Sequence, residues 1–293
     1  MFSQVMESQL DGSVNFVWHL DRGQIEARYV RRVNERFIVY LSVQTGCALG
    51  CRMCHLTQSK QVAARDLTVA EILMQAETVL AWFQKMVGRG EIEAATVVDF
   101  SFMARGDFFN NPHLIAQADD LLRSLEEMAR ELNLQVRIKI STIMPRAIDG
   151  ARLTEDVFRQ STPDLYYSLY SVDPHFRKRW LPRALNPESA LAMLTGWQAQ
   201  SRKLVILHSA FIAGENDSRA SINAMAEMIW RNGLRCDYNV VRYNPFSDVF
   251  GAETPHLGYC VAWLKAALPQ SHVKVIDRVG SDVYASCGMF NPA

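Results

Sequence analysis

The chain has 293 residues, of which about half are apolar, and its 31 basic residues equal its 31 acidic residues in number. A neutral chain has no global field to draw it onto nucleic acid, so contact with RNA would depend on a local basic patch. No segment approaches the roughly 20 apolar residues that span a bilayer, and residues 1–13 lack the basic and apolar regions of a signal peptide. We therefore expect one compact domain with no membrane contact.

The first segments in chain order predict β structure. Residues 14–20 and 24–29 flank the turn residues Asp21, Arg22 and Gly23, which predicts a hairpin. Within 24–29, polar and apolar residues alternate with a period of two, as in a half-buried strand. Residues 36–44 predict a third, apolar strand, which leads directly into a cysteine-rich loop.

That loop contains Cys47, Cys51 and Cys54 in the spacing C-x3-C-x2-C. Three thiolates on a short loop can bind three irons of a [4Fe–4S] cluster and leave the fourth iron open to a substrate. Gly46 and Gly50 would let the loop wrap around it. The alternatives are a chance group of buried cysteines and a zinc site. Zinc usually takes paired ligand groups, and the sequence offers only His55 as a fourth ligand, with no second C-x2-C.

The rest of the chain alternates helices and strands. Thr68 with Glu71 three residues later predicts a capping box at the start of a helix. Helices are then expected at 112–132, 186–201, 218–232 and 258–267, and strands at 95–102, 136–141, 165–171, 204–211, 236–243 and 273–276. About six strand–helix units predict an α/β fold with a parallel sheet and right-handed crossovers. Its chemistry would lie at the carboxyl ends of the strands, where the cysteine loop begins.

The cysteine spacing resembles the cluster loop of the radical S-adenosylmethionine (radical SAM) enzymes. This resemblance implies a partial (β/α)6 radical SAM barrel over residues 36–293, with residues 1–35 as an N-terminal β-hairpin extension outside it. It also implies two cofactors, a [4Fe–4S] cluster and SAM, whose amino and carboxylate groups chelate the open iron. One electron from the cluster cleaves SAM to methionine and a 5′-deoxyadenosyl radical. A flavodoxin- or ferredoxin-like electron donor and a cytoplasmic location are expected, and free thiols fit a reducing cytosol.

Further motifs resemble the RlmN/Cfr family of radical SAM RNA methyltransferases, which methylate adenosine carbons. The likeness extends from about Leu10 to the C-terminus. It is carried, in order, by residues 11–13, 20–24, 42–51, 67–72, 106–111, 141–142, 168–170, 214–218, 239–246 and 282–288. The resemblance implies that Gly106, Asp107, Ser141, Ser168 and Asn239 bind SAM. Without this resemblance, Gly106, Asp107, Ser141 and Ser168 would be interpreted as ordinary residues at strand ends. Asn239 would be interpreted as an amide that is hydrogen-bonded within the sheet.

The same resemblance assigns catalysis to Cys287 and to the residue at position 40. In the family, the cysteine at position 287 is methylated by one SAM and, after a second SAM yields the radical, transfers a methylene carbon to adenine. A second cysteine, seven residues before the first cluster cysteine, then releases the product and leaves a disulfide. Here that residue is Tyr40, which can exchange a proton but cannot form a disulfide. Cys236 and Cys260 are the only other thiols, and we expect Cys236 to be a buried strand residue, with the barrel mouth as the alternative.

Other departures concern RNA. The chain begins at the hairpin, so we expect it to lack the family's N-terminal helical domain, and Asp107 and Tyr170 replace a glutamate and a histidine of the family. Two groups of basic residues keep RNA or a nucleotide open as a partner: residues 175–183, which also contain aromatic rings, and Arg28, Arg31, Arg32 and Arg36. Each of these two groups could equally be a set of solvent-exposed side chains that bind no partner.

Three functions follow. The first is a radical SAM enzyme of RlmN/Cfr type that uses Cys287 to methylate an adenine carbon in RNA or a nucleotide. The second is another radical SAM reaction, hydrogen abstraction or carbon transfer, on a small molecule that is not RNA. The third is a protein that binds SAM and the cluster without turnover.

Overall fold

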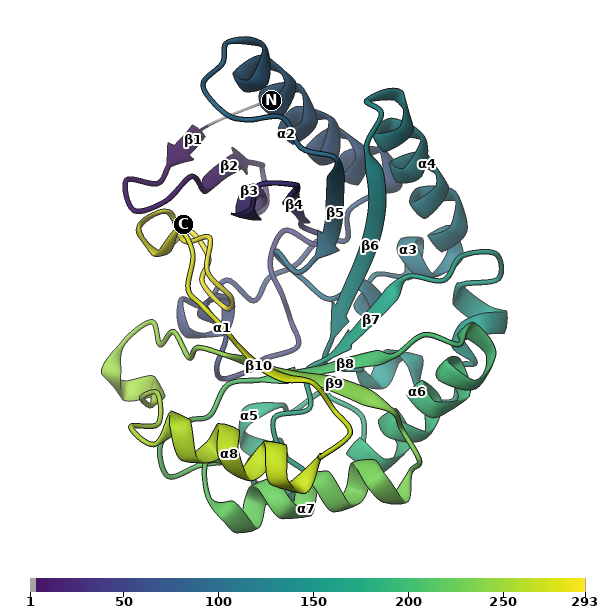
Figure 1. Ribbon diagram of the computed structural model, residues 1–293, viewed down its shortest axis with the longest axis vertical. Coiled ribbons are helices and arrows are strands. Elements are labelled where there is room, and N and C mark those ends of the chain that lie inside the picture. Colours follow the sequence, from purple (N-terminus) through teal and green to yellow (C-terminus); the bar gives the residue numbers. More distant parts are fainter. Residues whose placement is uncertain (1–3, 293) are drawn as a thin grey trace.

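The computed structural model describes residues 4–292 and contains one ten-stranded sheet, whose strands lie side by side in chain order (Figure 1). From β4 to β10 all neighbouring strands are parallel, as the alternating sequence predicts. The strands are β1 (Gln4–Glu7), β2 (Val14–His19), β3 (Gln24–Val33), β4 (Arg36–Leu41), β5 (Val97–Phe102), β6 (Gln135–Thr142), β7 (Asp164–Tyr167), β8 (Val205–Ser209), β9 (Cys236–Val241) and β10 (Val273–Ile276).

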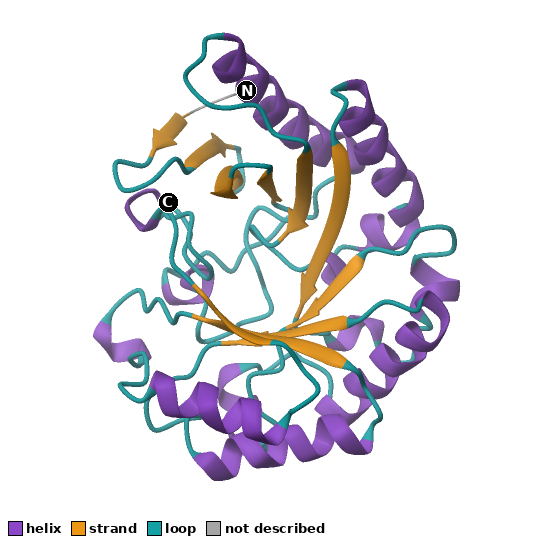
Figure 2. Cartoon of the chain, viewed as in Figure 1, coloured by secondary structure: helices purple, strands orange, loops and turns teal. Residues whose placement is uncertain are grey.

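The sheet curves into an incomplete barrel, and the longer helices cover its outer face (Figure 2). This is the expected partial radical SAM-type barrel. The α-helices are α1 (His55–Gln58), α2 (Val69–Gly88), α3 (Pro112–Ala116), α4 (Ala118–Glu131), α5 (Pro174–Trp180), α6 (Pro187–Ser201), α7 (Arg219–Arg231) and α8 (Leu257–Ala267). Short helical turns are η1 (Phe108–Asn110), η2 (Arg146–Ile148), η3 (Leu153–Val157), η4 (Asp248–Phe250) and η5 (Ser281–Val283). None of the helices within residues 4–292 is long and apolar enough to cross a membrane.

The N-terminal strands continue the barrel sheet. Strands β1, β2 and β3 pair antiparallel in sequence, and β3 pairs with β4, so the hairpin extends the same sheet. The chain after β10 returns to these strands: Gly280 N donates to the Asp11 carboxylate at 2.7 Å, and Ser8 Oγ donates to Asp282 at 2.7 Å. The C-terminus therefore lies beside the N-terminal strands (Figure 1).

The first helix after the cysteine loop begins as the sequence predicts. The Thr68 hydroxyl accepts a hydrogen bond from Glu71 N, and the Glu71 carboxylate accepts one from Thr68 N, which together form a capping box. The predicted apolar positions Ile72, Ala76 and Val79 are buried against the sheet. Local sequence is sufficient to predict α2, because the capping residues and the apolar periodicity both indicate a helix that begins after Thr68.

Four elements differ from expectation. The helix predicted over 112–132 is two helices, α3 and α4, with Gln117 between them in a non-helical conformation. Strand β1 and helices α1 and α5 were not predicted. Helix α5 lies in the segment interpreted as a basic and aromatic patch, and its Phe176 and Trp180 are buried in a core cluster beneath the cysteine loop.

Candidate functional site

The cysteine loop follows β4 at the carboxyl end of the parallel strands. Its backbone is fastened at three points: Cys47 N donates to Gln61 O, Arg52 N donates to Trp180 O, and the next residue, His55 N, donates to Gly288 O. Cys47, Cys51 and Cys54 all line one cavity at these strand ends, together with Cys287 from the other end of the chain. The fold thus brings four of the six cysteines to one place.

Two glycines let backbone segments approach closely around this cavity. A Cβ at Gly46 would lie 2.5 Å from Ala63 O, and one at Gly106 would lie 2.8 Å from Gln44 side-chain atoms. Gly106 also has a φ of +92°, in the region that favours glycine. The geometry at position 106 therefore requires a glycine.

The three loop thiols suit a cluster better than a single ion. Burial raises the pKa of Cys47 to about 12 and of Cys54 to about 11, and raises that of Cys51 well above its ordinary value. Bound iron would supply the positive charge that makes the thiolates favourable. Within residues 4–292, no three His, Cys, Asp or Glu side chains converge on one metal ion. In a [4Fe–4S] cluster each thiolate binds a different iron, so such convergence is not needed.

Asp107 lies in the same cavity and ties two strand ends together. Its carboxylate accepts hydrogen bonds from Ile143 N at 2.9 Å, the Thr142 hydroxyl at 3.0 Å and Phe109 N at 3.0 Å. Burial raises the pKa of Asp107 to about 6, although these hydrogen bonds lower it. A carboxylate that is costly to bury is well placed to accept the ammonium group of a bound amino acid.

Ser141 and Ser168 meet at a histidine that sequence analysis overlooked. His208 Nε2, on β8, hydrogen-bonds Ser168 Oγ at 2.6 Å and lies 3.3 Å from Ser141 Oγ. All three line the cavity, and burial lowers the pKa of His208 to about 4, so the imidazole is neutral near pH 7. The sequence did contain a signal for this residue: His208 is the one ionisable residue in the largely apolar strand of residues 205–209.

Cys287 lies on the wall between this cavity and a second one inside the barrel. Its side chain is exposed to these spaces, while the atoms crowded around it raise the pKa of the thiol. Tyr40 lines the second cavity, which Cys287 also lines. The structure therefore places the two predicted catalytic residues on one cavity.

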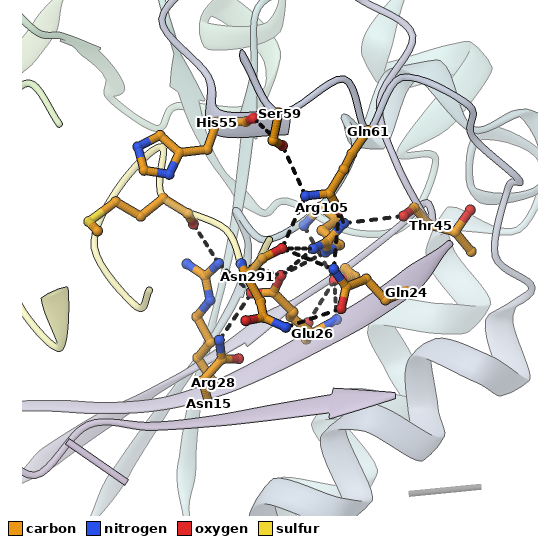
Figure 3. Close-up of polar contacts among 12 residues, drawn as sticks. Asn15, Gln24, Glu26, Arg28, Thr45, His55, Ser59, Gln61, Arg105 and Asn291 are labelled. Atoms are coloured by element: carbon orange, nitrogen blue, oxygen red, sulfur yellow. Dashed lines mark hydrogen bonds and ion pairs between the residues drawn. The ribbon is translucent and has the colours of Figure 1, made fainter. Parts of the chain in front are cut away.

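A buried polar network holds the segment that carries Cys287 (Figure 3). Glu26 accepts from both Arg28 at 2.8 Å and Arg105 at 2.7 Å, and each of these side chains is at most 2 % exposed. Arg28 donates to Met289 O at 2.7 Å. Asn291 is bound at its backbone: its carbonyl accepts from Arg105 at 2.8 Å, and its N–H donates to Glu26 at 3.0 Å. Nearer the cysteine, Asn244 Nδ2 donates to Cys287 O at 3.0 Å.

Several expected residues lie elsewhere. Asn239 lines the second cavity and not the one with the cluster cysteines. Cys236 begins β9, at the end of the sheet opposite the cysteine loop, and is buried, so it is a strand cysteine and not a barrel-mouth thiol. Cys260 is buried in α8. Neither thiol lines either of the cavities that Cys287 lines.

The two basic groups are not solvated patches as a whole. Arg177 is buried and donates to the carbonyls of Leu169, Ser171 and Leu185. Arg28 is buried in the network described above, and Arg31 donates to backbone carbonyls. Arg32 and Arg36 line the second cavity. Within residues 175–183, Phe176 and Trp180 are also buried, whereas His175, Lys178, Arg179 and Arg183 are exposed.

Comparison with known proteins shows which proteins the chain resembles. The dual-specificity RNA methyltransferase RlmN of Sulfurimonas denitrificans is 24% identical over 298 residues, covering 95% of this chain and 77% of the relative. A probable RlmN of Staphylococcus aureus is 27% identical over 289 residues, covering 97% of this chain and 74% of the relative. This chain is therefore similar to RlmN proteins over nearly its whole length. No family model matches it. A radical SAM methyltransferase from Sphaerobacter thermophilus has the same fold as this RlmN-like chain, with a TM-score of 0.79 and 22% identity over 99% of this chain and 80% of that one.

Proposed function

We propose that this RlmN-like protein is a radical SAM methyltransferase that delivers carbon through Cys287 to an unactivated carbon of an adenine. One observation carries the proposal: Cys287 lines the same cavity as Cys47, Cys51 and Cys54, although it is far from them in sequence. A carbon-carrying thiol must reach the place where SAM is bound and cleaved. The similarity to RlmN proteins along the chain supports the same reaction class.

In this proposal each group of residues has one task. Cys47, Cys51 and Cys54 hold the cluster, and Gly106, Asp107, Ser141 and Ser168 hold SAM. Bound there, and with one electron from a flavodoxin- or ferredoxin-like donor, the cofactors supply a methyl group and a 5′-deoxyadenosyl radical. Asp107 accepts the SAM ammonium group, and the neutral His208 fixes the two serine hydroxyls. Asn239 lies in the second cavity, so we assign it to the adenine side of Cys287.

Cys287 and Tyr40 act on the substrate side. The Cys287 sulfur carries the carbon between the two cavities, and its segment is held by Asn244 and the buried network. Tyr40 exchanges a proton with the adenine when the link to Cys287 breaks. Because a phenol forms no disulfide, release needs a thiol from another molecule: its thiolate attacks the Cys287 sulfur, the carbon leaves with the bonding electrons and takes up a proton, and a mixed disulfide remains on Cys287.

Peptide mass spectrometry of Cys287 tests this function. We expect a gain of one methyl group on Cys287 in anaerobically purified protein, and SAM-dependent methylation of an adenine substrate. Cys287→Ala should abolish product while SAM cleavage to 5′-deoxyadenosine continues. Cys260→Ala, which changes a thiol outside both cavities, should behave as wild type.

An unmodified Cys287 in protein that still cleaves SAM would contradict the transfer and favour the second function, a different radical reaction on a small molecule. The tyrosine at position 40 is the observation that favours this alternative. Absence of any SAM cleavage by cluster-loaded protein would contradict both reactions.

A further inference from the structure

The second cavity lies inside the curve of the sheet, on the other side of Cys287 from the cluster cysteines. It is lined by residues from β3 through β10, among them Tyr40 and Asn239. Strand register explains why these residues share a face: Tyr40 lies opposite Ser101, and Asn239 lies between His208 and Lys274. Cys287 and His208 line both cavities, so the two spaces adjoin at the proposed carbon carrier.

The lining of this cavity is strongly basic although the chain is neutral. Seven basic residues and one acidic residue, Asp277, line it. The basic residues are Arg28, Arg32, Arg36, Lys139, Arg242, Lys274 and Arg278. Such a concentration of one charge in a cavity attracts ligands of the opposite charge.

Three further carboxylates near the cavity do not neutralise this charge, because each of them is shared by two cations. Asp99 pairs with Lys139 at 2.5 Å and with Arg36 at 3.3 Å. Glu253 pairs with Arg242 at 2.5 Å and with Arg278 at 3.5 Å. Glu26 likewise serves both Arg28 and Arg105.

Two further cations have no acidic partner in the described part of the chain. Arg32 donates to the backbone carbonyl of Asp277 at 2.9 Å, and neither Arg32 nor Lys274 forms an ion pair within residues 4–292. Their charges are available to a ligand. The surplus of positive charge is therefore distributed around the cavity, on β3, β4, β6 and β10.

We propose that the substrate is a small phosphate-bearing molecule of nucleotide size, whose phosphate binds these cations while its base lies against Cys287. This rests on the proposed function, because Cys287 links the cavity to SAM. Guanidinium groups match phosphate oxygens with paired hydrogen bonds, and several cations suit a group carrying up to two charges.

The position of the cations favours a small molecule over an RNA strand. Arg36 and Lys139 line the cavity from strands β4 and β6, and their side chains are only partly exposed, at 30% and 14%. Internal phosphates of a polynucleotide are linked on both sides and cannot enter such a space singly. A terminal phosphate can.

Isothermal titration calorimetry with adenosine 5′-monophosphate, adenosine and an RNA hairpin tests this proposal on cluster-loaded protein. We expect the monophosphate to bind at least about ten-fold more tightly than adenosine. Arg32→Gln and Lys274→Gln should each weaken monophosphate binding by about ten-fold and leave adenosine binding within about two-fold. Lys265→Gln, an exposed lysine on α8, is the matched control and should change neither.

The outcomes separate this inference from the proposed function. Equal affinity for the monophosphate and adenosine, or no effect of either cavity variant, would overturn the phosphate site. Tighter binding of the RNA hairpin than of the monophosphate would overturn the small substrate. Cleavage of SAM and the mass of Cys287, both measured on wild-type protein without a nucleotide, report on the proposed function alone.

Discussion

Tyr40 is the residue whose identity bears most on how the proposed reaction ends. Its side chain lines the basic cavity that Cys287 also lines, and burial raises the pKa of Tyr40, so it is a neutral hydroxyl near pH 7. A neutral phenol can donate a proton, which phenylalanine cannot.

We expect Tyr40→Phe to lower formation of methylated product by ten-fold or more, the usual scale for losing a proton-transfer group. SAM cleavage should continue, so the ratio of 5′-deoxyadenosine to product should rise; both are measured by liquid chromatography. Tyr259→Phe, an exposed tyrosine on α8, is the control. An unchanged ratio in Tyr40→Phe would exclude a role for the hydroxyl.

A substitution at Gly106 tests whether the atoms packed around this residue leave room for a side chain. In Gly106→Ala the new Cβ would lie 2.8 Å from both Val43 and Gln44 side-chain atoms, at a φ of +92°. We expect a loss of about 1–3 kcal/mol of unfolding free energy, measured by urea denaturation.

A matched glycine substitution should act in the opposite direction. Gly196 is inside α6, and a Cβ added there would have no atom of another segment within 4 Å, so Gly196→Ala should stabilise the protein by about 0.5–1 kcal/mol. Equal destabilisation by both variants would show that the contacts around Gly106 are not the cause.

At the scale of elements, the start of α2 gives a prediction about pH. The hydrogen bond from Arg65, together with those from Thr68, holds the pKa of Glu71 at about 2, although burial raises it. The unfolded carboxyl titrates near pH 4.3. The stabilisation is therefore complete above that pH and is lost as the pH falls from about 4.3 toward 2.

We expect Glu71→Gln to lower the unfolding free energy by about 1 kcal/mol at pH 7, a value reduced for the solvent around this half-exposed pair. The difference from wild type should shrink below pH 4.3. Thermal unfolding followed by circular dichroism between pH 7 and 3.5 checks this. A difference that is constant over the range would contradict the ion-pair origin.

The helix predicted over 112–132 is interrupted at a position that the local sequence does not indicate. No glycine or proline marks the break at Gln117. The first turn of α4 is held by contacts from another segment: the Asp119 carboxylate accepts hydrogen bonds from the backbone N–H groups of Arg159, Gln160 and Ser161. These contacts lie 40 or more positions away, and a periodicity confined to one helix carries no information about them.

At the scale of the whole molecule, the buried ion network joins the two ends of the chain. Glu26→Gln would leave Arg28 and Arg105 buried without a carboxylate. We expect a loss of about 3–5 kcal/mol and faster hydrogen exchange in residues 287–292, because Met289 and Asn291 are held by the same side chains.

Thermal unfolding and hydrogen-exchange mass spectrometry measure these two effects. Glu227→Gln, which removes an exposed pair with Arg231, should cost less than about 0.5 kcal/mol. Destabilisation of Glu26→Gln without faster exchange at the C-terminal segment would mean that the network does not hold Cys287 in place.

Sequence alone determined the alternation of the main strands and helices, the capping box at Thr68 and the group of cluster cysteines. These are set by local periodicity, by short-range hydrogen bonds or by spacing within eight residues. The resemblance to RlmN-type proteins added Cys287, Tyr40 and the SAM-binding positions as predictions, and the fold brings most of them to one cavity.

Only the tertiary structure decided which of these residues meet. In the structure, Asn239 lines the second cavity and Cys236 lies at the far end of its strand. Arg28 and Arg177 are buried and bind buried partners. The fold also joins His208 to Ser141 and Ser168, and Glu26 to Arg105, across separations of 40 to 79 residues. The physical reason is that closing the sheet into a barrel brings residues from all its strands to one interior, where burial and charge, not neighbours in sequence, select their partners.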